Sequence, residues 1–158
     1  MEITKKHYTQ MSPSDFRYIR AKVRNVNHML NMGLDLRLSK HTYDKIANGN
    51  ATNVNKNIVR RLLKDYSIIE YKLILNGTYV DGDINKEDVI DERVVLRSNF
   101  SIDKDYQVVI VYSFTNNSVV TSWKNHRLDN HKGVDLSKYD LMQVGILWYL
   151  IENISMSS

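Results

Sequence analysis

The spacing of apolar residues along the first 65 positions predicts helices. In the longest of them, apolar residues recur every three or four positions, as in an amphipathic helix: Phe16, Ile19, Val23, Val26 and Leu30. The preceding Ser12-Pro13-Ser14-Asp15 supplies capping oxygens and a proline suited to a first helical turn, and Gly33 suits the end. A short helix over residues 40–47 would be capped by Ser39 and ended by Asn48-Gly49. A third would open at Thr52 or Asn53 and run over residues 57–65.

From residue 67 the pattern changes to that of β-strands. Segments rich in β-branched and aromatic residues cover 67–75, 92–98, 106–114 and 119–124, with polar turn residues between them. In the second segment, alternation places Arg93, Val95 and Arg97 on one face and Val94, Leu96 and Ser98 on the other. In the fourth segment, it places Val119, Thr121 and Trp123 on the same side. Short connections predict that these strands pair in the antiparallel sense.

The order of these elements predicts one α+β domain over residues 1–158, with N-terminal helices followed by a four-stranded antiparallel β-sheet and a C-terminal helix. Its parts would be a basic helical part (1–66), the sheet (67–125), a polar loop (126–139) and the C-terminal helix (140–153). Apolar residues cover much of the circumference of that last helix, and one helix at the end of a small domain seldom buries all of it. We therefore expect a homodimer through the surplus face, with complete burial in a monomer as the alternative.

Composition narrows the location and the partners. The chain has no cysteine and no apolar stretch of the roughly 20 residues that span a bilayer, so a cytoplasmic protein without a membrane partner is expected. Residues 1–64 carry 13 Lys and Arg against 4 Asp and Glu, whereas residues 65–158 carry 9 against 14. The basic first half suggests contact with the phosphates of RNA or another nucleic acid. The residues expected to make such contacts on the helices are Arg17, Arg20, Arg24, Arg60 and Arg61. A solvated basic helix face remains the alternative.

The richest stretch in reactive groups is the end of the fourth strand with the loop after it, over residues 119–140. Cleavage of RNA through its own 2′-hydroxyl needs a base, an acid and cations for the phosphate but no metal, and His, Lys, Arg and Thr supply these groups. Asp129 and His131 could bind a divalent ion, but no third ligand is recognisable, so we expect no metal and no other cofactor. As alternatives, Asp129 and Asn130 would bond the local backbone in Asx turns, and Trp123 would belong to the core.

Several short segments carry a resemblance to a known group of proteins. They are Leu38-Ser39-Lys40-His41, Ile68-Ile69-Glu70-Tyr71-Lys72, Arg93 to Ser98, Val119 to Asn125, and Asp129-Asn130-His131-Lys132 with Asp135 and Tyr139. They resemble small phage and polymorphic-toxin proteins of one ribonuclease group, the BECR group, which is named after barnase, EndoU, colicin and RelE-like ribonucleases. The resemblance covers roughly residues 38–140. It implies N-terminal helices before a four-stranded antiparallel sheet, and either metal-independent RNA cleavage or a degenerate descendant that binds RNA or a protein. It would place His41, Arg97, Thr121 and His131 at the catalytic centre, with Lys45 and Lys124 as phosphate contacts.

Residues 39–50 support a different function. This segment is similar to the end of the recognition helix in phage-repressor-type helix-turn-helix domains, in which Asn-Gly closes the helix. The implied alternative is a phage-encoded regulator or inhibitor whose basic N-terminal helices bind DNA or a nucleic-acid-processing enzyme.

Overall fold

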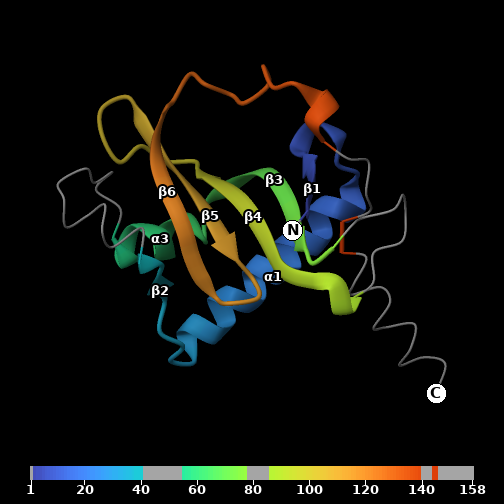
Figure 1. Ribbon diagram of the computed structural model, residues 1–158. Helices are drawn as coiled ribbons and strands as arrows, with labels where there is room; N and C mark the ends of the chain where they lie inside the picture. Colours follow the sequence, from blue (N-terminus) through green and yellow to red (C-terminus); the bar gives the residue numbers. More distant parts are fainter. Residues whose placement is uncertain (1, 41–54, 78–85, 140–143, 146–158) are drawn as a thin grey trace.

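The computed structural model describes residues 2–40, 55–77, 86–139 and 144–145. These residues form a mixed β-sheet with two helices, α1 and α3, against one of its faces (Figure 1). The sheet has six strands in the order β1-β3-β4-β5-β6-β2. In chain order the elements are β1 (Glu2–His7), α1 (Pro13–Asn31), β2 (Arg37–Leu38), α3 (Lys56–Leu62), β3 (Tyr66–Leu75), β4 (Val89–Ser98), β5 (Tyr106–Ser113) and β6 (Ser118–His126). Three short 3-10 helices cover Tyr8–Gln10, Lys86–Asp88 and Leu136–Lys138.

The prediction of a four-stranded antiparallel sheet after an all-helical first part is wrong. The four predicted strands do form, as β3 to β6, and they pair in succession in the antiparallel sense. The structure adds β1 antiparallel to β3 at one edge and β2 parallel to β6 at the other. Strand β1 has no apolar face, and β2 has only two residues, so periodicity carries no signal for them.

Strand β1 buries polar side chains that find partners elsewhere in the fold. Lys6 pairs across the ladder with Tyr71 on the helix side of the sheet, where it is only 9% exposed. Its ammonium lies 2.9 Å from Oδ2 of Asp15 on α1, and the same oxygen accepts a hydrogen bond from the backbone N–H of Ser12. A buried charge is tolerated when it is paired and hydrogen-bonded. The polar strand is therefore held by a partner that lies outside its own segment.

The described helices agree with their predicted caps and apolar stripes. Helix α1 begins after a Ser12 cap that accepts a hydrogen bond from the backbone of Asp15, and Gly33 follows it at φ 104°. Helix α3 forms as predicted, but its cap is Asn55, whose side chain accepts from the N–H of Ile58.

Two predicted helices fall largely outside the described residues. For the helix predicted over residues 40–47, only residue 40 is described. For the C-terminal helix, only Val144 and Gly145 are described; they form a turn in which Gly145 has φ 78°, which is not helical. The rest of the predicted homodimer surface lies outside the described residues. Of the helices in the described residues, none is long and apolar enough to cross a bilayer.

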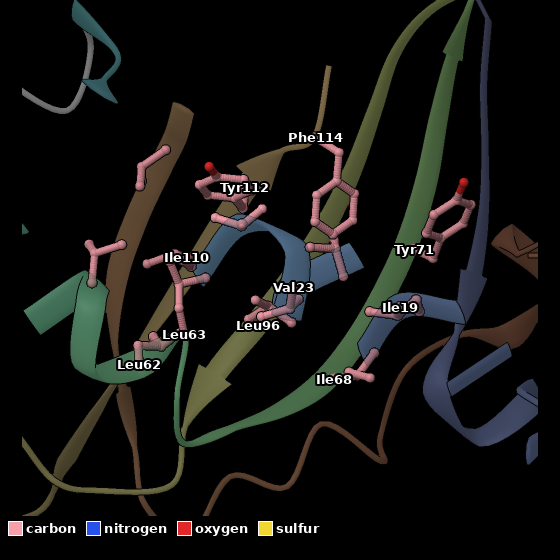
Figure 2. Close-up of a cluster of buried hydrophobic side chains, with 14 of the residues drawn as sticks. Ile19, Val23, Leu62, Leu63, Ile68, Tyr71, Leu96, Ile110, Tyr112 and Phe114 are labelled. Carbon is pink, nitrogen blue, oxygen red and sulfur yellow. The ribbon is translucent and has the colours of Figure 1, made fainter. Parts of the chain in front are cut away.

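The core lies between the sheet and the two helices (Figure 2). Apolar residues from α1, α3 and the inward-facing positions of β3 to β5 meet there, among them Ile19, Val23, Leu62, Leu96 and Ile110, each at most 1% exposed. Each such side chain contributes roughly 1.5–3 kcal/mol when it leaves water. A second, smaller cluster of Ile69, Val95, Val109 and Val111 lies on the opposite face, called the outer face below.

A β-bulge in β6 corrects the predicted alternation of that strand. Thr121 pairs with Val111 whereas Val119 pairs with Tyr112, so Val120 is the extra residue. Val119 consequently packs in the helix-side core, while Thr121 shares the outer face with Val111. The prediction that Val119 and Thr121 lie on one side is therefore wrong. A similar shift in β3 places Glu70 opposite Val95 on the outer face.

Candidate functional site

Residues 127–139, called the strap below, leave the end of β6 and run back across the sheet to β1 (Figure 1). Arg97 on β4 holds the strap through its guanidinium group. Its Nη2 donates to the carbonyl of Arg127 at 2.8 Å, its Nη1 donates to the carbonyl of Asp129, and its Nε donates to Oε1 of Gln107 at 2.5 Å. Tyr8 adds a third contact to the strap, since its hydroxyl donates to the carbonyl of Asn130 at 2.9 Å. Arg97 and Tyr8 thus attach the strap to two separate parts of the fold.

Short turns shape the middle of the strap. Oδ1 of Asp129 accepts from the N–H of His131 at 3.0 Å, and Oδ1 of Asn130 accepts from the N–H of Lys132 at 3.0 Å. The interpretation of Asp129 and Asn130 as Asx-turn residues is therefore confirmed. His131 itself has φ 59°, a left-handed backbone conformation that is uncommon outside glycine.

These turns bring His131 close to His7 of β1, and the two are called the histidine pair below. His7 is fully buried, with its Nδ1 2.8 Å from the hydroxyl of Thr9. Its ring lies 4.5 Å from the tilted ring of Tyr8 and 5.3 Å from that of Tyr139, which it meets edge-on. Within the described residues, Nε2 of His7 and Nε2 of His131 are both buried and have no hydrogen-bond partner. Buried imidazole nitrogens without partners are uncommon in folded proteins and require an explanation.

Burial also lowers the pKa of both histidines. For His7, desolvation lowers the pKa, and the backbone of His131 and the carboxylate of Glu70 raise it in part. For His131, desolvation again lowers the pKa; Asp129 raises it, while the charges of Arg97 and His7 lower it. Burial therefore favours the neutral form of both rings.

A group of charges fixes the far end of the strap. Glu70 is 8% exposed and lies 4.0 Å from the ammonium of Lys5 and 3.3 Å from that of Lys72. The ring of Tyr139 lies 4.6 Å from the same Lys5 ammonium. Burial raises the pKa of Tyr139, and the neighbouring Glu70 raises it further. The strap therefore ends on β1 and β3, beside the histidine pair.

A cavity of about 440 Å³ opens next to the histidine pair, between the strap, α1 and the ends of the strands. Its wall combines aromatic rings, cations and amides with the smaller side chains of Ser67, Ile68 and Ile69. The aromatic groups are Tyr8, Phe16 and Tyr66, the cation besides Arg97 is Arg20, and the amides include Gln107 and Asn130. Cavities of this size and mixed polarity commonly hold small ligands.

The predicted basic residues of α1 and α3 lie exposed, and one of them, Arg20, lines the cavity. In the part of the chain that the structure describes, no carboxylate forms an ion pair with Arg17, Arg20, Arg24, Arg60 or Arg61. Burial raises the pKa of Tyr66, while the nearby charges of Arg20 and Arg24 lower it, so both guanidinium groups lie close to that hydroxyl. Arg61 lies over the ring of Phe100 at 3.9 Å. We call these five exposed arginines the arginine row.

The structure brings together some of the predicted site residues. Arg97 and His131 lie close to each other, linked through Asp129 of the strap. Thr121 shares the outer face with Arg97 but lies two strands away, roughly 10 Å at ordinary strand spacing. Lys124 pairs with Val108 on the helix side of the sheet and forms an ion pair with Asp103 at 3.5 Å, so it points away from Arg97. The predicted residues His41 and Lys45 lie outside the described residues.

Sequence reasoning missed the partner of His131. His7 lies on a strand with no apolar alternation, and nothing in its neighbours Lys6 and Tyr8 indicates burial. Only the pairing of β1 with β3 and the path of the strap bring it to His131.

Neither a metal site nor a relative identifies the function. In residues 2–40, 55–77, 86–139 and 144–145, no three His, Asp or Glu side chains converge as metal ligands. Comparisons with protein-family models, with curated proteins and with solved structures give no match for this chain. The function must therefore be inferred from the geometry.

Proposed function

We propose that this protein binds RNA and cleaves it without a metal ion. Binding is supported by the arginine row, whose guanidinium groups have no carboxylate partners within the described residues and of which Arg20 lines the cavity. Unpaired guanidinium groups bind phosphate in bidentate fashion and attract nucleic acid over a distance. This activity would take place in the cytoplasm, where RNA is available.

Cleavage is supported by one observation, the histidine pair, in which the ring of His7 lies near the backbone of His131 and both Nε2 atoms are buried without a hydrogen-bond partner among the described residues. A neutral imidazole can remove the proton from a ribose 2′-hydroxyl, whose oxygen then attacks phosphorus. A protonated imidazole can give a proton to the departing 5′-oxygen, so the products are a 2′,3′-cyclic phosphate and a free 5′-hydroxyl. In this proposal His131 keeps its expected role and His7 is its partner, while Arg97 holds the strap in place.

The positions of the two rings have a consequence for access. Both Nε2 atoms are covered, so RNA would have to displace the Asn130-His131 turn of the strap to reach them. The lowered pKa of both histidines also sets the pH of the reaction. Because one ring must be protonated and the other neutral, cleavage should be fastest at mildly acidic pH and should decline above pH 7.

The test of cleavage is incubation of the pure protein with total RNA in EDTA at pH 5 to 8. We expect cleavage with cyclic-phosphate ends, and His131→Ala or His7→Ala should reduce its rate about 100-fold or more. His28→Ala is the matched control, since His28 is exposed on α1, and it should leave the rate unchanged. Thermal unfolding of each variant separates loss of chemistry from loss of folding. Intact RNA under all these conditions would rule out cleavage.

The test of binding is the salt dependence of affinity for a short single-stranded RNA. Each phosphate contact should contribute about 0.7 to the slope of log affinity against log salt. Arg20→Gln combined with Arg24→Gln should lower both the affinity and the slope, whereas Lys104→Gln, an exposed cation outside the row, should change neither. Salt-independent binding, or none, would contradict the proposed role of the row. Sequence-specific binding of duplex DNA would instead favour the regulator.

A further inference from the structure

Two amide side chains in the wall of the cavity beside the strap have donor groups left over. Oε1 of Gln107 accepts from Nε of Arg97, which carries only donors, so the orientation of that amide is determined. Oδ1 of Asn130 accepts from the N–H of Lys132, which determines the second amide in the same way. Each side-chain NH₂ group then remains as a donor without a partner in the described residues.

The two cations of the cavity wall, Arg97 and Arg20, differ in the number of contacts that they make within the protein. Arg97 donates one N–H from Nε to Gln107 and one from each Nη to the strap carbonyls, so three of its five N–H groups hold the protein's own acceptors. Arg20 has no ion pair or hydrogen bond within the described residues and lies over the ring of Phe16 at 5.6 Å. The hydroxyl of Tyr66, which has no hydrogen bond to a described residue, lies near this guanidinium group. The cavity wall therefore contains one cation, Arg20, that makes no hydrogen bond to a described residue. It also contains two amides, those of Gln107 and Asn130, whose NH₂ groups can donate to a ligand.

A ligand that matches this wall needs an anionic group, several acceptors and a flat ring. Phosphate suits Arg20, because a guanidinium group binds it through parallel hydrogen bonds. The rings of Tyr8, Phe16 and Tyr66 offer apolar surface against which a base can stack. Uracil and guanine present a carbonyl oxygen at the ring position where cytosine and adenine present an amino donor, so amide donors at that position favour uracil or guanine.

We propose that this cavity binds one nucleotide with a keto base, its phosphate at Arg20 and its acceptor atoms, the keto oxygen among them, at the amides of Gln107 and Asn130. The inference rests on the proposed function, because the cavity would be the subsite that selects which nucleotide of a bound RNA lies there. It extends that function by naming the preferred base. A site that hydrogen-bonds its ligand discriminates strongly, because the wrong base leaves its donors unpaired.

Titration calorimetry with the four nucleoside monophosphates tests the proposal directly. UMP and GMP should bind at least tenfold more tightly than AMP and CMP, and inorganic phosphate should compete only weakly. Equal affinity for all four, competition by phosphate alone, or no binding at millimolar concentration would each overturn it.

Two isosteric variants test the donors. Gln107→Glu retains an oxygen for Arg97, and Asn130→Asp retains an oxygen for the N–H of Lys132, but each removes the NH₂ group and adds a charge. Each should weaken UMP binding at least tenfold. Asn25→Asp, which adds the same charge to an exposed position of α1, should change it less than twofold. Unchanged UMP affinity in a folded Gln107→Glu and a folded Asn130→Asp would refute the assigned contacts.

The two proposals fail in different ways. If RNA binds in a salt-dependent manner but no nucleotide does, the arginine row stands and the base subsite is wrong. If UMP binds but RNA is neither bound nor cleaved, the subsite stands and the action on RNA is wrong.

Discussion

Arg97 offers the sharpest test of how the strap covers the histidine pair. Arg97→Lys keeps the positive charge but replaces a planar fork with a single ammonium, which can retain about one of the three contacts. A hydrogen bond to a charged group contributes roughly 1.5–3 kcal/mol when buried. The contacts to the strap carbonyls are exposed, and water can replace them, so we discount each to about 1 kcal/mol. The substitution should therefore lower the free energy of unfolding by about 2 kcal/mol.

The local effect should exceed the global one. The N–H of Arg127 bonds to the carbonyl of Asp105 at 2.8 Å, and that of Asp129 bonds to the carbonyl of His126 at 2.9 Å. Hydrogen exchange at these two amides should accelerate once the strap is released. Because the variant keeps its charge, a rise in the pKa of His131 toward 6.5 would report lost burial.

The assays are urea unfolding, amide hydrogen exchange and NMR titration of the histidine rings. Arg93→Lys is the matched control, because Arg93 lies on the same face of β4 but forms its ion pair with Asp91, at 2.7 Å. It should leave the exchange of the strap and the histidine titrations unchanged. An Arg97→Lys protein with unaltered strap exchange and an unaltered pKa of His131 would refute the role assigned to Arg97.

Three further predictions concern stability. The pKa of His7 and of His131 is lower in the folded protein than in the unfolded chain, so the unfolded chain binds more protons just below pH 6.5. The free energy of unfolding, measured by urea titration, should therefore fall as the pH decreases from 7.5 to 5, and it should fall less in His7→Gln. A free energy of unfolding that does not change with pH would contradict this. Gly145→Ala should lower the free energy of unfolding by about 2 kcal/mol in the same assay, because Gly145 has φ 78° and the added Cβ would lie 2.7 Å from the Tyr18 ring. A variant as stable as the wild-type protein would show that the turn at Gly145 does not form. Asp15→Asn keeps the geometry of the helix cap but removes the negative charge beside the buried ammonium of Lys6, so we expect the free energy of unfolding to fall by about 3 kcal/mol. A decrease below 1 kcal/mol would show that water reaches the ammonium of Lys6.

The sequence by itself determined the features that depend on neighbours along the chain. The Ser12 cap and the apolar spacing of α1 are local, and the structure has both. The alternation of Val94, Leu96 and Ser98 against Arg93 and Arg97 is also local, because successive side chains of a strand point to opposite faces. The Asx turns of the strap involve residues two positions apart, so composition alone indicated them.

Only the tertiary structure decided the features that depend on distant pairing. β1 has no apolar face and forms a strand because β3 offers it an edge and Asp15 neutralises its buried Lys6. The bulge at Val120 arises in the pairing of β6 with β5, and it reverses the face of Val119 relative to Thr121. The histidine pair joins the first strand to a loop near the other end of the chain. Spacing along a sequence describes one element at a time, whereas the partner of a polar side chain is set by which elements pack together.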